Sequence, residues 1–203
     1  MPPVESRQVE LGYKHELANG ALLTAALFDI TKGLEFTQPA TAAGALPTYV
    51  QAGQQRNKGL ELGVGGPVLP GLSLSCGLLL LQAKVVNNGN AAQAGKRPAG
   101  VPRITLPLYA DWRIAAVPGL SLSAGAIHFG KQYVDLANVR EIPAWTRFDA
   151  GAQFKTQLNG AQTTFTLNVE NLADRRYWSS VTAGSLALGA PRTVKFSATV
   201  AFD

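Results

Sequence analysis

Hydrophobic and polar residues alternate with a period of two along most of the chain, which is typical of β-strands with one hydrophobic face. In residues 9–14, for example, Val9, Leu11 and Tyr13 alternate with small or charged residues. The pattern recurs in segments at residues 9–14, 21–31, 60–64, 72–81, 104–113, 120–126, 147–155, 164–170 and 193–202. We therefore predict nine strands of roughly ten residues each.

The predicted connections alternate between short and long. Asn19-Gly20 and Asn159-Gly160 are sequences that favour tight hairpins. The short connections are predicted at residues 17–20, 66–71, 115–119 and 157–161, and the long ones at 32–55, 84–102, 134–144 and 172–190. This arrangement is typical of an antiparallel transmembrane β-barrel of the outer membrane.

The two faces of the predicted strands differ in chemistry. One face is hydrophobic and would contact lipid, whereas the other carries Glu10, Lys14, Glu61, Asp111, Arg113, Arg147, Asp149, Lys155 and Lys195. A soluble β-sandwich binding protein with polar outer faces is the alternative that this pattern leaves open. Pro107 lies inside a predicted strand and has no N–H for the ladder, so we expect a bulge there.

The number of strands bears on domain organisation. Closed barrels of this class have an even number of strands, whereas nine is odd. The chain would also begin on the long-loop side and end on the short-turn side. We therefore expect residues 1–203 to form part of a larger barrel.

Composition excludes several other classes of protein. Only 15% of the residues are charged and 46% are hydrophobic, which rules out a disordered tail and a coiled coil. The single cysteine, Cys76, cannot form an internal disulfide. The sequence predicts neither a signal peptide nor a transmembrane helix. Basic residues give a net charge of +5 but are widely spaced, so we do not expect nucleic-acid binding.

No group of residues predicts catalysis. His15 and His128 lack the Cys or carboxylate neighbours of a metal site. Ser121 and Ser123 lie outside any Gly-x-Ser-x-Gly elbow, so a hydrolase triad is not supported. We expect no enzyme activity, no metal site and no cofactor.

Five motifs, in this order, resemble those of one family. They are residues 55–62 (QRNKGLEL), 95–103 (GKRPAGVPR), 130–133 (GKQY), 168–177 (NVENLADRRY) and 189–192 (GAPR). With the hydrophobic last strand, the chain resembles the C-terminal part of the β-barrel of TonB-dependent outer-membrane receptors of the ferric-siderophore type. The match extends over nearly the whole chain.

The resemblance implies a 22-stranded barrel closed by an N-terminal plug. Residues 1–203 would supply its last nine strands, without the plug and without the segment that contacts TonB. Such a receptor takes up iron–siderophore complexes with energy from TonB, is surrounded by lipid in the outer membrane of a Gram-negative bacterium, and is inserted by the barrel assembly machinery. Phe202 resembles the near-terminal aromatic of the assembly signal, although Asp203 follows it.

Several aromatic residues lie near the ends of predicted strands. One interpretation places Trp112, Trp145, Trp178, Tyr133 and Tyr177 in the aromatic girdles at the membrane interfaces. The other is contact with a siderophore at the outer mouth of the barrel. The candidates for ligand contact are Tyr133, Arg140, Trp145, Tyr177 and Trp178, with arginine suited to anionic chelates because it donates two parallel hydrogen bonds.

Overall fold

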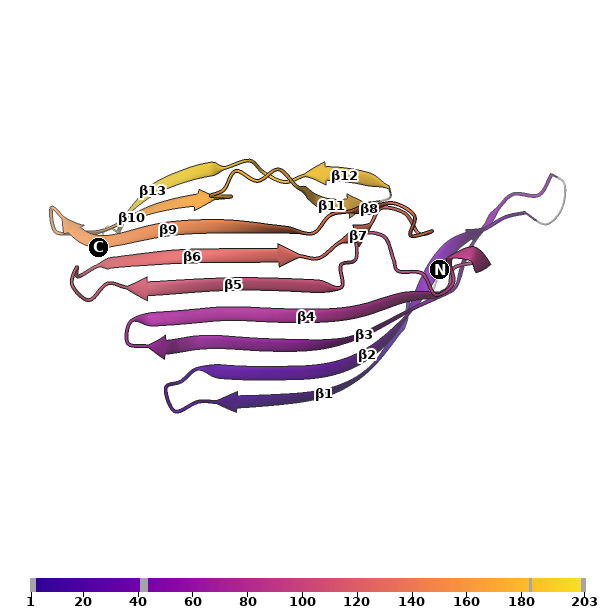
Figure 1. Cartoon of the computed structure of the whole chain (residues 1–203), viewed down its shortest axis with the longest axis horizontal. Coiled ribbons are helices and arrows are strands. Elements are labelled where there is room, and N and C mark those ends of the chain that lie inside the picture. Colours follow the sequence, from indigo (N-terminus) through magenta and orange to yellow (C-terminus); the bar gives the residue numbers. More distant parts are fainter. Residues whose placement is uncertain (1–2, 41–43, 183, 202–203) are drawn as a thin grey trace.

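A computed structural model describes residues 3–40, 44–182 and 184–201 of the chain. Nine strands form one antiparallel sheet in the order β1-β2-β3-β4-β5-β6-β9-β10-β13 (Figure 1). They are β1 (Ser6–Glu16), β2 (Leu22–Gln38), β3 (Thr48–Leu69), β4 (Leu72–Asn87), β5 (Ile104–Arg113), β6 (Leu120–Phe129), β9 (Trp145–Leu158), β10 (Ala161–Glu170) and β13 (Thr193–Ala201). The prediction of nine antiparallel strands is confirmed.

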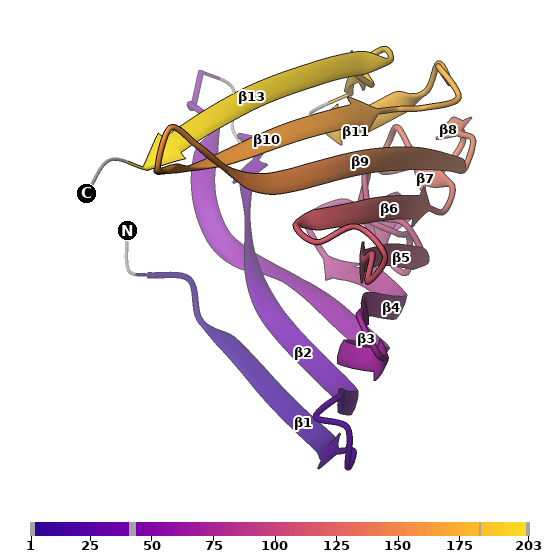
Figure 2. The same cartoon turned by 90° about the vertical axis from the view of Figure 1, so that its left-hand side faces the viewer.

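Each strand of this sheet pairs with the next one along the chain, and the sheet bends like part of a barrel wall (Figure 2). The long connections carry small elements of their own: η1 (Ala91–Gln93), the pair β7 (Gln132–Tyr133) and β8 (Glu141–Ile142), and the pair β11 (Trp178–Thr182) and β12 (Ser185–Leu188). These elements lie at one end of the sheet and the short turns lie at the other (Figure 1). The chain is therefore an open segment of a barrel.

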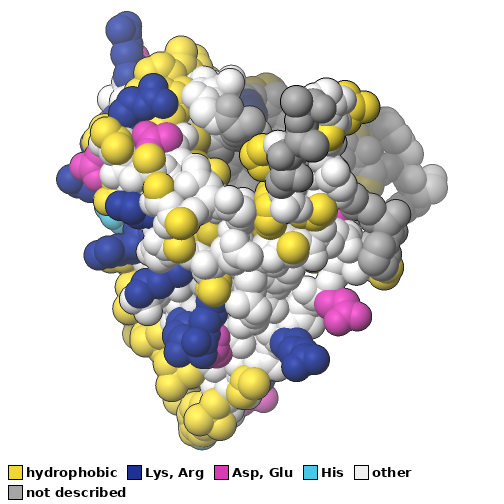
Figure 3. All heavy atoms as spheres, turned by 90° about the vertical axis from the view of Figure 1, so that its right-hand side faces the viewer, with side chains coloured by type: hydrophobic (Ala, Val, Ile, Leu, Met, Phe, Trp, Pro, Cys, Tyr) yellow, Lys and Arg dark blue, Asp and Glu magenta, His cyan; other side chains and the backbone are white. Residues whose placement is uncertain are grey.

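The register of the sheet confirms that hydrophobic and charged residues occupy opposite faces. Residues that pair directly across antiparallel strands share a face. Leu27 pairs with both Leu11 and Leu60, and all three belong to the hydrophobic face. In the view from the long-loop end, hydrophobic side chains follow the convex margin of the sheet (Figure 3). Leu11 is 75% exposed and Phe196 68% exposed, as expected of side chains that contact lipid.

The soluble β-sandwich alternative is wrong. A sandwich covers the hydrophobic face of one sheet with a second packed sheet. Within the described ranges the only other sheets are the two-stranded pairs β7–β8 and β11–β12, which are too small to cover nine strands. No helix in these ranges is long and apolar enough to cross a membrane.

The predicted loop at residues 32–55 is mostly strand. β2 continues to Gln38 and β3 begins at Thr48, and the two pair up to Gln38 and Thr48. A membrane strand needs only about 9–11 residues to span the hydrocarbon, whereas β3 has 22. The polar outer parts of these strands lack the hydrophobic alternation that identifies a membrane strand, so the pattern alone could not reveal them.

The expected bulge at Pro107 is absent from the register. Pro107 pairs directly with Ile127, and β4 and β5 keep one register on both sides of it, from Cys76–Leu108 to Leu79–Thr105. On the β4 side Gly77 lies against the proline ring, where a Cβ atom would be 3.5 Å from Cγ. A glycine opposite the ring leaves room for it without a shift of the strand.

Candidate functional site

Asn171, in the NVENLADRRY motif, is the most completely buried large side chain of the described residues, at 1% exposure. Its Nδ2 donates to the carbonyl oxygens of Arg175 at 2.9 Å and Ala190 at 3.0 Å. Its Oδ1 accepts from the Arg175 backbone N–H at 2.9 Å. Its φ of 52° is a left-handed conformation that asparagine tolerates better than most residues. One side chain therefore joins the end of β10 to the segment before β13.

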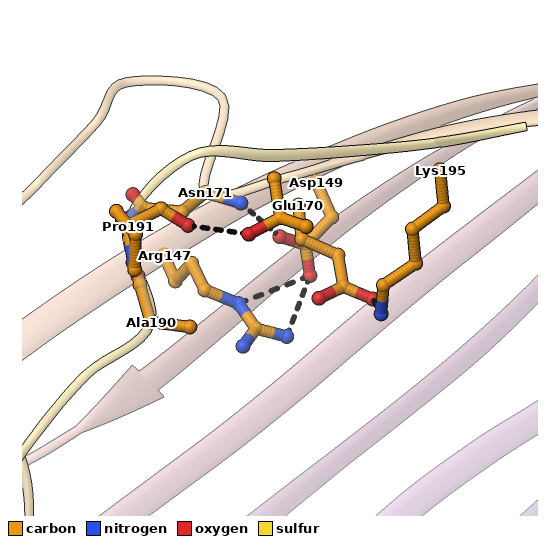
Figure 4. Close-up of polar contacts among 8 residues, drawn as sticks. Arg147, Asp149, Glu170, Asn171, Ala190, Pro191 and Lys195 are labelled. Carbon is orange, nitrogen blue, oxygen red and sulfur yellow. Dashed lines mark hydrogen bonds and ion pairs between the residues drawn. The ribbon is translucent and has the colours of Figure 1, made fainter.

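Charged residues of β9 and β10 surround this asparagine on the polar face (Figure 4). The Asn171 backbone N–H donates to Asp149 Oδ1 at 2.8 Å, and Arg147 donates to Asp149 Oδ2 from Nη2 at 2.8 Å. Lys195 of β13 donates to Glu170 at 2.5 Å. These bonds connect three neighbouring strands at the point where the sheet meets the last long loop.

Asp174 completes the same arrangement. Its carboxylate accepts from the backbone N–H of Arg192 at 3.0 Å, so the segment before β13 is held at a second point. The spacing of the motif thus has a structural explanation: Asn171 and Asp174 fix where β13 begins. We call these two residues, with Asp149, the β13 clamp.

An aromatic stack lies beside the β13 clamp. The Trp145 ring packs between Phe129, at a centroid distance of 4.9 Å, and Tyr177, at 4.2 Å. Trp145 and Tyr177 are only 7% and 8% exposed. Gly189, whose N–H donates to the Tyr177 carbonyl at 2.8 Å, lies directly against the Tyr177 ring.

Three of the five candidate ligand residues line one hollow. Trp145, Tyr177 and Trp178 border a space of about 230 Å³ together with Arg175 and Arg176. Within the described part of the chain, the buried Nε1 of Trp145 has no hydrogen-bond partner. The hollow thus combines flat aromatic surface with two exposed guanidinium groups. The two arginines were not among the predicted candidates, although their place in the motif beside Tyr177 was a signal.

The other two candidates lie elsewhere. Tyr133 and Arg140 belong to the β7–β8 loop, where the Val134 N–H donates to the Arg140 carbonyl at 2.8 Å. Tyr133 lines a second hollow of about 400 Å³. The Arg140 side chain is 73% exposed and pairs with Asp135 at 3.4 Å. The five candidates therefore do not form one cluster, and their contact with a ligand stays a prediction.

The aromatic-girdle interpretation is wrong for Trp145 and Tyr177. Trp145 pairs with Phe129 and alternates with Thr146, so it lies on the same face as Arg147 and Asp149 and not on the lipid face. Tyr177 packs against it on that side. Trp112, by contrast, is 53% exposed on the hydrophobic face near the short turns, which agrees with a girdle position. Phe202, the predicted assembly signal, lies outside the described residues.

Asp135 organises the β7–β8 loop. Its carboxylate accepts from the backbone N–H of Val139 at 3.1 Å and of Arg140 at 2.9 Å. These two bonds, the Val139 bond first, lower the pKa of Asp135, because they favour the charged form. The loop should therefore be most stable above the pKa of about 3.9 that an unfolded aspartate has, and lose this support as the pH falls through the lowered folded value.

Replacement of Asp135 by asparagine should open this loop at neutral pH, since one of the two acceptor oxygens becomes an NH₂ group. Amide hydrogen exchange at Val139 and Arg140, corrected for the intrinsic rate, should be several-fold faster than in the wild type at pH 7. The exchange rate of the wild type should approach that of the variant only below a pH of about 4. Glu141→Gln, which removes an exposed carboxylate that bonds Lys131, is the control. Equal exchange in the Asp135 variant and the wild type would contradict this role.

No cluster of metal-ligating side chains is found in the part of the chain that the structure describes. What the hollow beside Trp145 offers is aromatic surface and two guanidinium groups.

Comparison with known proteins identifies relatives across the whole chain. The family model described as TonB dependent receptor-like, beta-barrel matches residues 1–172. The ferrichrome receptor FcuA of Yersinia enterocolitica is 31% identical over 203 residues, which are 98% of this chain and 26% of that protein. The probable TonB-dependent siderophore receptor PiuA of Acinetobacter baumannii is 29% identical over 91% of this chain and 25% of its own length.

Solved structures of outer-membrane receptors and transporters resemble this chain as well. BauA, the ferric preacinetobactin receptor of Acinetobacter baumannii, superposes with a TM-score of 0.87 and is 32% identical, over 98% of this chain and 30% of its own. The ferric citrate transporter FecA has a TM-score of 0.75 at 18% identity, a likeness of fold. The chain spans about a quarter of the length of the two curated relatives.

Proposed function

Because the chain belongs to the TonB-dependent receptor β-barrel family, we propose that it is the C-terminal barrel portion of an outer-membrane receptor that takes up ferric siderophores with energy from TonB. Proteins of this family are transporters and receptors of the Gram-negative outer membrane. The observation that carries the proposal is the hollow of Trp145, Tyr177 and Trp178 with Arg175 and Arg176, which the β13 clamp positions at the long-loop end.

The chemistry of this hollow suits a ferric chelate. Siderophore ligand groups are anionic oxygens and often aromatic rings, and guanidinium groups bind anionic oxygens with two parallel hydrogen bonds. Aromatic rings add dispersion and stacking. TonB would act through a part of the receptor that residues 1–203 do not supply, and the barrel assembly machinery would insert the protein. The chain itself performs no reaction in this proposal.

Uptake of iron tests the proposal directly. In iron-starved cells that carry the gene, a stop codon introduced in the β9 coding segment should abolish uptake of ⁵⁵Fe presented with at least one siderophore of a chemically diverse panel. An antibody against the η1 loop should detect the protein in the outer-membrane fraction. Unchanged uptake for every siderophore, or absence of the protein from that fraction, would contradict the proposal.

Replacing Trp178 with alanine should weaken the apparent affinity for the transported siderophore about two- to tenfold, since one aromatic contact contributes about 0.5–1.5 kcal/mol. Trp178 is 37% exposed, so its loss should leave the amount of receptor unchanged. The measurement is the concentration dependence of ⁵⁵Fe uptake, normalised to receptor in the outer membrane. Trp112→Ala, on the lipid face, is the matched control and should leave the affinity unchanged. An equal effect of both substitutions would remove Trp178 from the ligand site.

A further inference from the structure

Three Asn-Gly pairs occur in the chain: Asn19-Gly20, Asn88-Gly89 and Asn159-Gly160. Each lies where the chain turns after the end of a strand. Asparagine is one of the thermolabile residues, and it loses its side-chain amide most easily when glycine follows, because glycine has no Cβ atom to shield its backbone nitrogen. Whether a given pair reacts in the folded protein depends on the contacts of the asparagine amide and the glycine N–H.

The reaction takes place within the pair. The glycine N–H gives its proton to a base, the glycine nitrogen forms a bond to Cγ of the asparagine, and Nδ2 leaves as ammonia. Water then adds to either carbonyl of the cyclic imide and opens it to aspartate or to isoaspartate. The net change consumes one water molecule and releases one ammonia molecule. A hydrogen bond that holds the amide or the N–H therefore slows the reaction.

Both reacting groups of the first pair are held. Asn19 Nδ2 donates to the Pro67 carbonyl oxygen at 2.9 Å, and Oδ1 accepts from the Ala21 N–H at 3.1 Å. The Gly20 N–H donates to the Leu17 carbonyl oxygen at 2.8 Å. Attack at this pair first requires these bonds to break, so the folded turn protects Asn19.

The second pair is held in the same way. Asn88 Nδ2 donates to Gln93 Oε1 at 2.5 Å, and Oδ1 accepts from the Asn90 N–H at 3.3 Å. The Gly89 N–H donates to Asn87 Oδ1 at 3.0 Å. The glycine nitrogen and the amide that it would attack thus each have another partner, and this arrangement protects Asn88.

The third pair has none of these bonds. Asn159 and Gly160 form the whole turn between Leu158 and Ala161, which pair with each other at the short-turn end of the sheet (Figure 1). Both turn residues are exposed, and neither the Asn159 side chain nor the Gly160 N–H has a hydrogen-bond partner in the described part of the chain. A Cβ atom on Gly160 would meet nothing within 4 Å. The backbone rotation that attack requires therefore has to open only the turn itself.

We propose that Asn159 is a site of spontaneous deamidation in the folded receptor, whereas Asn19 and Asn88 keep their amides. The aspartate product adds a negative charge and retains the turn, because aspartate also tolerates the left-handed conformation that Asn159 adopts at a φ of 51°. The isoaspartate product carries one additional carbon in the backbone between β9 and β10 and so disturbs their hairpin. The modification is separate from siderophore binding, because Trp145 lies at the other end of β9.

Incubation of the receptor in ¹⁸O-labelled water at mildly alkaline pH tests this proposal. The receptor is purified from outer membranes in non-ionic detergent, and mass spectrometry of its tryptic peptides gives the rate at each asparagine. Trypsin separates the three pairs, since it cleaves after Lys32, Lys84 and Lys155. Asn159 should react at least about tenfold faster than Asn19 or Asn88, because those two must first break their hydrogen bonds.

Two further measurements connect these rates to the structure. In guanidinium chloride the three pairs should react at similar rates, because unfolding removes every protecting bond. In the folded variant Asn87→Ala/Gln93→Ala, which lacks the partners of the Gly89 N–H and of Asn88 Nδ2, the rate at Asn88 should rise toward that at Asn159 while the rate at Asn19 stays unchanged.

Three results would overturn the proposal. They are an intact Asn159 in a folded receptor that reacts once it is unfolded, a reaction of folded Asn19 or Asn88 as fast as that of Asn159, and a rate at Asn88 that the double substitution leaves unchanged. Iron uptake by the variant Asn159→Asp, which carries one product of the reaction, should equal that of the wild type and reports separately on the siderophore proposal.

Discussion

Cells that produce the receptor with Asn171 replaced by alanine should contain little folded receptor in the outer membrane. The substitution leaves the carbonyl oxygens of Arg175 and Ala190 and the Arg175 N–H without their partner in a buried place. Each unmet group costs about 1–3 kcal/mol, and alanine at a φ of 52° adds about 1 kcal/mol of strain. A total of about 4–10 kcal/mol is comparable to the 5–15 kcal/mol that stabilises a typical protein.

Resistance of the receptor to protease in outer-membrane vesicles, measured across a urea series, gives the size of this effect. Asn168→Ala removes an exposed asparagine from β10 in the same motif and should leave the urea midpoint unchanged. Asn171→Gly separates the two causes, since glycine relieves the backbone strain but makes none of the side-chain bonds. If the glycine variant is as stable as the wild type, the hydrogen bonds of the β13 clamp are not what holds β13.

Replacing Gly189 with valine should destabilise the receptor by about 3 kcal/mol and disrupt the candidate ligand site. A Cβ atom at this position would lie well inside the van der Waals contact distance of three atoms of the Tyr177 ring. Tyr177 cannot move aside freely, because it is 8% exposed and packs on Trp145 at 4.2 Å. Overpacking of this kind usually costs about 1–3 kcal/mol, and displacement of Tyr177 would also deform the hollow that we assign to the siderophore.

The same urea series measures the loss of stability, and the concentration dependence of ⁵⁵Fe uptake measures the effect on the ligand site. Gly65→Ala is the control, because a Cβ atom there meets nothing within 4 Å; it should change stability by less than about 0.5 kcal/mol. A Gly189→Val receptor with normal stability and normal apparent affinity would show that the Tyr177–Trp145 contact is dispensable. Normal stability with weakened affinity would show that the Tyr177–Trp145 contact matters for the ligand site alone.

The strands that cross the membrane were predictable because lipid imposes a simple rule on them. Val9, Leu11 and Tyr13 must face outward, and the residues between them must not, so the period of two is visible in the sequence. The Asn159-Gly160 hairpin was predictable for a similar local reason: both residues have positive φ, 51° and 84°, which few other pairs tolerate.

The outer parts of β2 and β3 were not predictable, because above the membrane neither face must be hydrophobic. The same reason hid the neighbouring basic residues at the outer ends of β3 and β4. Arg56 and Lys84 are 28 residues apart in the sequence, and only the register places them side by side. A charge that looks scattered along the chain thus becomes concentrated on one surface when the strands pair.

The candidate site, too, was predictable from the sequence only in part. The motif at residues 168–177 is enough to identify the family, since the spacing of Asn171, Asp174 and Tyr177 is local. That Asn171 fixes the start of β13 depends on Ala190, 19 residues away. That Trp145 packs on Tyr177 depends on β9 and the last long loop, which meet only in the folded sheet. The sequence by itself determined the strands, their faces and the family, because these follow from local alternation and spacing. Only the tertiary structure decided which side chains meet, because those contacts depend on the register between strands distant in the chain.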